Sequence, residues 1–200
     1  MLKVICCEQL DYSSLPRSRL LGSKSVGNII TRHAESKVTP RDVANDGTEF
    51  VNMSNGLTDV VISILAMAMA EEAATPQQQR LATWIACQDQ NLLGMGTISF
   101  SLSQMPWKLN SFEEDRSFMV RSCERALAKT DWDRLSYEPR ENWAIDRFQT
   151  LAKMTGHLQP SEFGDAGKRP ALDPNPLGAK CEQHGAFLHS SGCIVCNGDS

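Results

Sequence analysis

Four residues near the end of the chain have the types and the spacing of metal ligands. Cys181 and His184 are separated by two residues, and the same spacing separates Cys193 from Cys196. Two ligands at this spacing can curl around one ion, and two such pairs fill the four tetrahedral positions that Zn²⁺ occupies in structural sites. The sequence therefore predicts a structural zinc site whose ligands are Cys181, His184, Cys193 and Cys196.

The residues around the two pairs indicate a small module rich in turns. Gly185 directly follows the first pair and Gly198 comes two residues after the second, where a tight turn often requires a positive φ. Residues 186–192, between the pairs, predict a short strand and a turn. With these features, residues 180–200 resemble zinc-ribbon and zinc-knuckle proteins. The resemblance is one of ligand spacing: it implies a small tail stapled by zinc, and it specifies no activity.

Other uses of these residues remain open. A disulfide is one alternative, but seven cysteines is an odd number and no secretory signal is apparent. His189 could replace one of the ligands, although we expect it on the solvent-facing side of the hairpin. A catalytic zinc ion needs an open coordination position, and four good ligands leave none. A tail this small needs some staple, and structural zinc is the favoured one.

The composition is that of a folded globular protein. The chain has 200 residues, of which 41 % are hydrophobic and 22 % charged, enough for one ordinary domain and a small appendage. A net charge of −4 disfavours broad binding to phosphate backbones. Residues 1–7 are too short for a signal core because Glu8 follows, and the uncharged run between Asp59 and Glu71 is about half of the roughly 20 apolar residues that a bilayer requires. We expect a cytoplasmic protein without a membrane-spanning helix.

Two helices in the middle of the chain form the most regular pattern. Apolar residues recur at helical spacing over residues 57–69 and surround most of the circumference, which predicts a buried helix. A second helix should open at Thr75, with a capping box to Gln78 and Pro76 at its first position. Because the connection is short, we expect an antiparallel helix hairpin.

Two further helices are predicted in the second half. Ser111 and Glu114 have capping-box spacing, and the helix that they begin runs to about Lys129. Its acidic residues 113–115 lie in the first turn, where the helix dipole favours negative charge. The last helix begins near Pro139 and ends at Gly156.

Short apolar runs predict a small sheet. Residues 2–10, 26–30, 49–53 and 94–102 have the composition or alternation of strands. The expected fold class is α/β, more specifically α+β, in which the helix hairpin and two further helices pack with a small sheet, followed by the zinc-ribbon tail. The expected divisions are a main domain at 1–156, a proline-rich linker at 157–179 and a zinc-binding tail at 180–200.

No set of residues points to catalysis. No histidine lies between residues 34 and 156, and neither the Gly22 segment nor the Gly94 segment completes a nucleotide-binding motif. We expect four cysteines on apolar faces and two carboxylate pairs at the surface: Cys6, Cys7, Cys87 and Cys123, and Glu71 with Glu72 and Asp131 with Asp133. The aromatic residues of the second half are expected mostly in the core, with a partner-binding patch as the alternative: Trp107, Trp132, Tyr137 and Trp143.

The favoured function is therefore that of a non-enzymatic cytoplasmic protein that binds or regulates another protein. In size, acidity and lack of a catalytic set, the chain resembles bacterial immunity proteins, antitoxins and accessory proteins of defence systems. One alternative is a nucleic-acid-binding protein that uses the zinc tail, aided by Lys168, Arg169 and Lys180. Another is an enzyme whose active site the sequence does not reveal.

Overall fold

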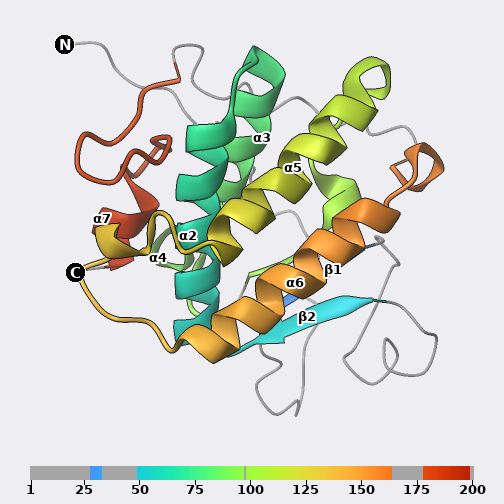
Figure 1. Ribbon diagram of the computed structural model, residues 1–200. Helices are drawn as coiled ribbons and strands as arrows, with labels where there is room; N and C mark the ends of the chain where they lie inside the picture. Colours follow the sequence, from blue (N-terminus) through green and yellow to red (C-terminus); the bar gives the residue numbers. More distant parts are fainter. Residues whose placement is uncertain (1–27, 33–48, 97, 164–177, 199–200) are drawn as a thin grey trace, which may run out of the picture.

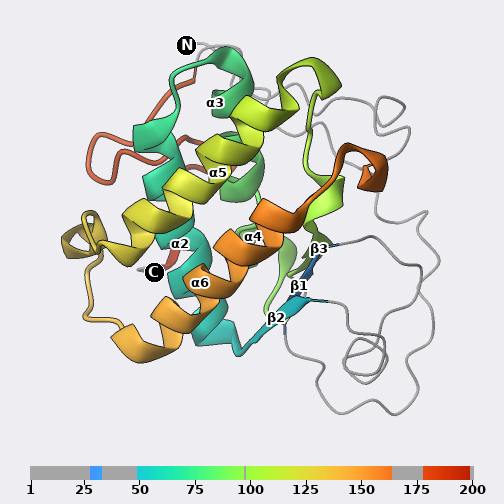
Figure 2. The same ribbon diagram turned by 45° about the vertical axis from the view of Figure 1, so that its right-hand side comes forward.

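The computed structural model describes residues 28–32, 49–96, 98–163 and 178–198. These residues form a three-stranded sheet with helices on one of its faces, as Figures 1 and 2 show. The α+β class expected from the sequence is confirmed. The predicted strand at residues 2–10, the Gly22 segment, and most of the expected linker lie outside the described residues.

The sheet has the order β2-β1-β3. Strand β1 (Asn28–Thr31) pairs antiparallel with β2 (Phe50–Met53), with Asn28 opposite Met53. Strand β3 (Ser99–Ser101) runs parallel to β1 on its other side, with Ile30 opposite Phe100. The sequence alternation predicts a strand over residues 94–102, but β3 covers only Ser99–Ser101 of the described residues. A turn with positive φ at Gly94 and Gly96 occupies the beginning of the segment, and a 3₁₀ turn begins at Leu102.

The helices gather around α2 (Asn55–Glu72), which contacts β2 and several other helices. Ser54 caps it by accepting a hydrogen bond from the backbone N–H of Leu57 at 3.4 Å. From residue 61 to residue 70 every side chain is buried, as the apolar circumference predicts. The other helices are α3 (Pro76–Ala86), α4 (Gln90–Leu93), α5 (Phe112–Leu127), α6 (Glu141–His157) and α7 (Ile194–Gly198), with 3₁₀ turns at Leu102–Gln104, Leu109–Ser111, Trp132–Arg134 and Pro160–Glu162.

Helices α2 and α3 pack against each other as the predicted hairpin. Thr75 caps α3 by accepting from the N–H of Gln78 at 3.2 Å, and Pro76 is the first helical residue. The side chain of Gln78 reaches back to the N–H of Ala74 at 2.9 Å, one residue before the N-cap. The predicted capping box is therefore formed only in its first half.

The start of α5 differs from the sequence prediction. Ser111 accepts no capping hydrogen bond; its hydroxyl donates to Asp115 at 2.7 Å instead. Asp115 is only 1 % exposed, and this burial raises the pKa of its carboxyl above the ordinary value, although the hydrogen bond from Ser111 lowers it. The helix dipole therefore favours the negative charges of the exposed Glu113 and Glu114, whereas Asp115 is a buried acid.

The aromatic residues divide between the core and the surface. Trp107 and Trp132 are buried, and their indole N–H groups donate to the carbonyls of Leu102 and Ala126. Tyr137 and Trp143 are 38 % and 53 % exposed. The prediction that these aromatic residues lie in the core is therefore correct for Trp107 and Trp132, but not for Tyr137 and Trp143. Among the residues that the structure describes, none of the helices is both long and apolar enough to cross a bilayer.

Replacing Phe118 with alanine should lower the free energy of unfolding by about 3–5 kcal/mol, because this α5 side chain is fully buried and its loss leaves a cavity. Urea unfolding followed by circular dichroism measures the change. Leu109→Ala is the control, since Leu109 is 73 % exposed and its replacement should alter the stability by no more than about 0.5 kcal/mol. Equal losses in the two variants would contradict the packing of α5.

Candidate metal centre

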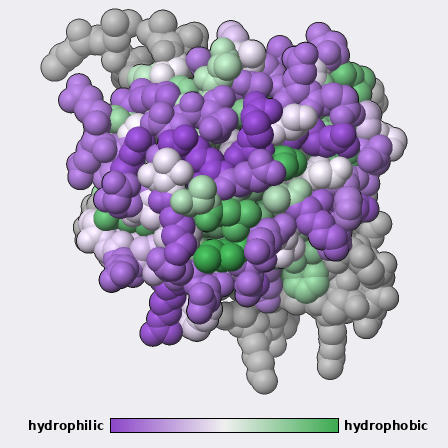
Figure 3. Space-filling model, viewed as in Figure 1, coloured by the Kyte–Doolittle hydropathy of each residue, from purple (hydrophilic) through white to green (hydrophobic). Residues whose placement is uncertain are grey.

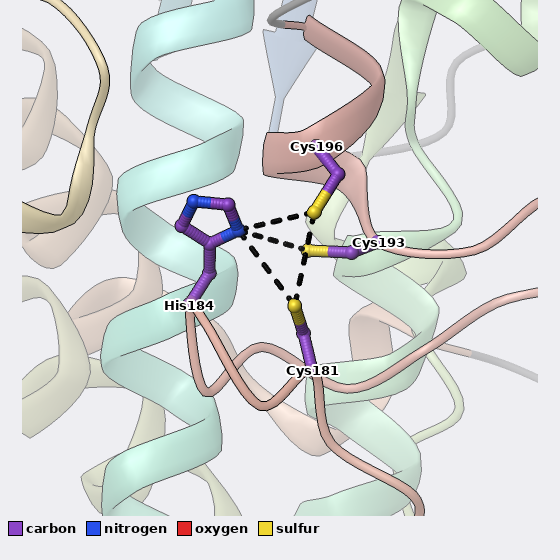
Figure 4. A group of neighbouring side chains, drawn as sticks. All are labelled: Cys181, His184, Cys193 and Cys196. Carbon is purple, nitrogen blue, oxygen red and sulfur yellow. Dashed lines mark hydrogen bonds between the residues drawn. The ribbon is translucent and has the colours of Figure 1, made fainter.

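The four predicted ligands lie together at one point. Their ligand atoms, three Sγ atoms and Nδ1 of His184, all lie within 4.8 Å of one another. Nδ1 is 3.7 Å from the Sγ atoms of Cys181 and Cys193 and 3.3 Å from that of Cys196. The Sγ atoms of Cys181 and Cys196 are 3.8 Å apart. Figure 4 shows the side chains converging from two segments of the tail, and this arrangement could hold a metal ion.

The first ligand pair is held by a hydrogen-bonded turn. The N–H of Gly185 donates to the carbonyl of Cys181 at 2.8 Å, and the N–H of Cys181 donates to Ala186 at 2.8 Å. Gly185 has a φ of 69°, as the sequence predicts. A Cβ at this position would also lie 2.7 Å from Nη1 of Arg134 and 2.9 Å from Oε1 of Glu71. Glycine therefore fits this position for two reasons: it adopts the positive φ of the turn, and its lack of a Cβ lets the turn approach the main domain closely.

The second pair is built on a short helix. Cys193 directly precedes α7 and Cys196 lies within it, and the N–H of Asn197 donates to the carbonyl of Cys193 at 3.0 Å. Gly198 is the last residue of α7 and does not have the positive φ expected from the sequence. Gly192 has a positive φ instead. Its φ of 107° turns the chain just before Cys193. Between the pairs, single antiparallel bridges, such as His189 with Gly192, replace the predicted strand.

One side of the cluster is buried and the other faces solvent. His184 and Cys193 are 1 % and 4 % exposed, whereas Cys181 is half-buried and Cys196 is exposed. Burial raises the pKa of the Cys193 thiol to about 12. Partial burial also raises the pKa of Cys181, but hydrogen bonds from backbone N–H groups outweigh it and leave this pKa below its ordinary value. Sulfur and imidazole ligands of this kind suit zinc and similar soft or borderline metals.

The tail that carries the cluster is packed into the hydrophobic core. Ala186, Phe187, Ile194 and Val195 are all at most 2 % exposed and belong to the same buried cluster as the side chains of α2. Helix α7 contacts α2 directly, and Figure 1 shows the two side by side. The sequence predicts a tethered tail, and the structure shows that this tail is docked.

Two cations of the chain fasten the first turn. The guanidinium of Arg134 donates to the carbonyl of His184 at 3.2 Å and to Oε1 of Glu71 on α2 at 2.9 Å. The ammonium of Lys180 donates to the carbonyl of Ala70, also on α2. Both contacts join segments far apart in the sequence. The spacing of the predicted ligands therefore could not predict either contact.

A buried carboxylate, Asp89, fastens the second half of the tail. Its Oδ2 accepts from the amide of Asn197 at 2.8 Å and lies at ion-pair distance, 3.2 Å, from Nε2 of His189. Its Oδ1 accepts from the N–H of Asn91 and so caps α4. Burial raises the pKa of Asp89, but these contacts outweigh it and place the pKa below the ordinary value. The prediction that His189 faces solvent is wrong. Its side chain is 0 % exposed and lies beside the buried carboxylate of Asp89.

Asp89, Arg134 and Asn197 are the residues of the site that the sequence did not identify. Asp89 could have been recognised as the N-cap of a short helix, but nothing in the sequence pairs it with residues 189 and 197. The contact between Asp89 and Asn197 spans 108 positions. Only the folded arrangement of the tail shows it.

The other candidate reactive residues do not join the cluster. Cys87 and Cys123 are buried, and burial raises the pKa of Cys123 to about 12. Asp131, expected at the surface, is 2 % exposed because Arg125 donates to both of its carboxylate oxygens. Glu71 and Glu72 are partly exposed and form ion pairs with arginines. Cys6 and Cys7 lie outside the described residues.

No protein-family model, curated protein or solved structure matches the chain. The function must therefore be argued from the geometry of the chain itself.

Replacing Asp89 with alanine should lower the free energy of unfolding by about 1–3 kcal/mol, because the amide of Asn197 and the backbone N–H of Asn91 lose their buried acceptor. Urea unfolding at fixed metal content measures this loss. Asp146→Ala removes an exposed carboxylate of α6 and should change the stability by no more than about 0.5 kcal/mol. If Asp89→Ala proved as mild as Asp146→Ala, Asp89 would not anchor the tail.

Proposed function

We propose that the chain is a non-enzymatic protein that binds another protein and whose C-terminal tail is held by one structural Zn²⁺ ion. Cys181, His184, Cys193 and Cys196 are the ligands. The observation that carries the proposal is the convergence of their four ligand atoms within 4.8 Å. A set of this kind fills the coordination sphere of one ion.

The separations support zinc. With Zn–S bonds of about 2.3 Å and a Zn–N bond of about 2.0–2.1 Å, a tetrahedral site has S···S edges of about 3.8 Å and S···N edges of about 3.6 Å. The cluster has an S···S distance of 3.8 Å and S···N distances of 3.3–3.7 Å. These four edges match a tetrahedral site, and the other two S···S edges, Cys181–Cys193 and Cys193–Cys196, are at most 4.8 Å long.

A structural role follows from the number and surroundings of the ligands. Catalytic zinc keeps one position for water or substrate, whereas four protein ligands leave none. His184 and Cys193 are also almost fully buried, so a substrate cannot approach from their side. The ion would fix the turn at residues 181–185 to α7 and hold both against α2. Its contribution is shape and stability.

The proposed partner is another protein. Trp143 and Tyr137 are partly exposed, and the guanidinium of Arg140 lies 4.9 Å from the centre of the Trp143 ring. These are the three residue types most enriched where interfaces are strongest. Arg140, Trp143 and two neighbours also line a shallow hollow. The face in Figure 3 is largely hydrophilic with limited apolar areas, which suits an interface built on a few anchors.

Within this proposal, the immunity, antitoxin and defence-accessory classes remain the specific candidates, with the cytoplasm as the location. Binding to nucleic acid is less well supported. The ammonium of Lys180 is already used by the carbonyl of Ala70 and lies 5.2 Å from the ring centre of Phe187. Lys168 and Arg169 lie outside the described residues, and the net charge is −4.

Metal analysis tests the zinc site. Protein purified without chelators should contain about one zinc per chain, and Cys193→Ser should lower this occupancy because one of four ligands is lost. Cobalt substituted for zinc should give the absorption spectrum of a tetrahedral thiolate site. Cys87→Ser removes a buried cysteine outside the cluster and should leave the zinc content unchanged. Metal-free protein would refute the central part of the proposal.

Affinity capture from the source cells tests the interaction. The zinc-loaded chain should retain a specific protein, and Trp143→Ala should weaken the binding at least ~30-fold if Trp143 is an interface anchor. Leu109→Ala, at another exposed apolar residue, should have no effect. DNA and RNA binding should be measured in parallel over a range of salt concentrations. Nucleic-acid affinity that falls steeply with salt, together with an inert Trp143→Ala, would favour the alternative function.

A further inference from the structure

The two less buried cysteines of the cluster lie next to each other. Cys196 is exposed and Cys181 is half-buried, and their Sγ atoms are 3.8 Å apart. Cys193, in contrast, is 4 % exposed and belongs to the hydrophobic core. As Figure 4 shows, the neighbouring pair comes from different segments, Cys181 from the first turn and Cys196 from α7. Cys181 and Cys196 are therefore the two cysteines of the cluster that a small reagent can approach most easily from solvent.

Adjacent accessible thiolates have a characteristic reactivity. Cysteines that bind a metal are deprotonated, and a thiolate attacks peroxides. When a second cysteine is near, the oxidised sulfur is captured as a disulfide before it is oxidised further. A disulfide requires an S–S distance of about 2.05 Å, so the two sulfurs must approach by about 1.8 Å. Rotation of two side chains can supply a movement of this size.

We propose that Cys181 and Cys196 are an oxidation site for peroxides, at which a disulfide replaces two zinc ligands and releases the ion. This inference rests on the proposed zinc binding. The Cys196 thiolate attacks one oxygen of hydrogen peroxide, the O–O bond breaks, and a sulfenic acid and hydroxide form. The Cys181 thiolate then attacks the Cys196 sulfur, the S–O bond breaks, and a second hydroxide leaves. The two thiolates lose two electrons, and the peroxide takes up these electrons and two protons to become two waters.

The buried half of the site keeps its place in this reaction. His184 and Cys193 are left as two ligands, too few to hold the zinc ion tightly. The contact of Asn197 with Asp89 does not involve the reacting atoms. The new disulfide still joins the first turn to α7. Oxidation therefore exchanges a metal cross-link for a covalent one at the same position in the fold.

The test uses the 200-residue chain loaded with zinc. Hydrogen peroxide is added in the presence of a chromogenic chelator, and peptide mapping by mass spectrometry locates any disulfide. We expect one zinc released per disulfide formed, and the disulfide joins Cys181 to Cys196. Cys87→Ser should respond like the native chain, because Cys87 is buried outside the cluster.

Two histidine variants separate the pair from the third cysteine. Cys196→His keeps four zinc ligands but removes one sulfur of the pair, so peroxide should release zinc at least ~10-fold more slowly. Cys193→His keeps the pair, so peroxide should still join Cys181 to Cys196 by a disulfide. Should a variant fail to fold, the disulfide map of the native chain decides.

The two proposals can fail separately. A chain that binds no zinc before peroxide is added overturns the zinc site and this inference together. A chain that binds zinc but keeps it under excess peroxide overturns the inference alone. So does a disulfide that involves Cys193, or oxidation of Cys196 to a sulfinic acid without a disulfide.

Discussion

A helix that is apolar on every side must be covered on every side, and α2 imposes this constraint on the whole chain. Its side chains from residue 61 to residue 70 are buried without a break. Packing against α3, α5, α6 and β2 covers much of the helix, and α7 of the tail contacts it as well. At about 25 cal/mol for each Å² of apolar surface removed from water, an open side on this helix would be costly. The tail is therefore part of the core that α2 requires.

The tail can fulfil this role only if it is fixed by more than apolar contacts. Its described part is the short segment 178–198, too small to form a core of its own. Each half is instead held by polar contacts with the main domain: Arg134 binds the first turn, Lys180 of the tail donates to the carbonyl of Ala70 on α2, and Asp89 binds the hairpin and α7. A buried carboxylate such as Asp89 would destabilise the fold if it were unpaired, but with Asn197, His189 and Asn91 around it, it makes one position of the tail the favoured one.

Local patterns predicted the parts of this arrangement that depend on neighbouring residues. The cluster of Cys181, His184, Cys193 and Cys196 and the buried α2 were recognisable because their spacing follows from the geometry of a turn and of a helix. The same reasoning failed where a distant partner decides the outcome. His189 and Asp131 were expected at the surface, but Asp89 and Arg125 bring them inside. At Ser111 the capping box does not form because the residue ends a 3₁₀ turn and lacks the extended backbone of an N-cap.

The orientation of His184 bears on the proposed zinc site. Its Nδ1 faces the three sulfurs, so in the neutral tautomer that binds a metal the proton is on Nε2. This nitrogen is buried and has no acceptor among the described residues. A buried polar group without a partner costs about 1–3 kcal/mol. Binding of zinc to small Cys and His sites contributes about 10–16 kcal/mol at neutral pH, which far exceeds this cost. When Nδ1 is a zinc ligand, as proposed, this gain outweighs the cost of a buried Nε2–H without an acceptor.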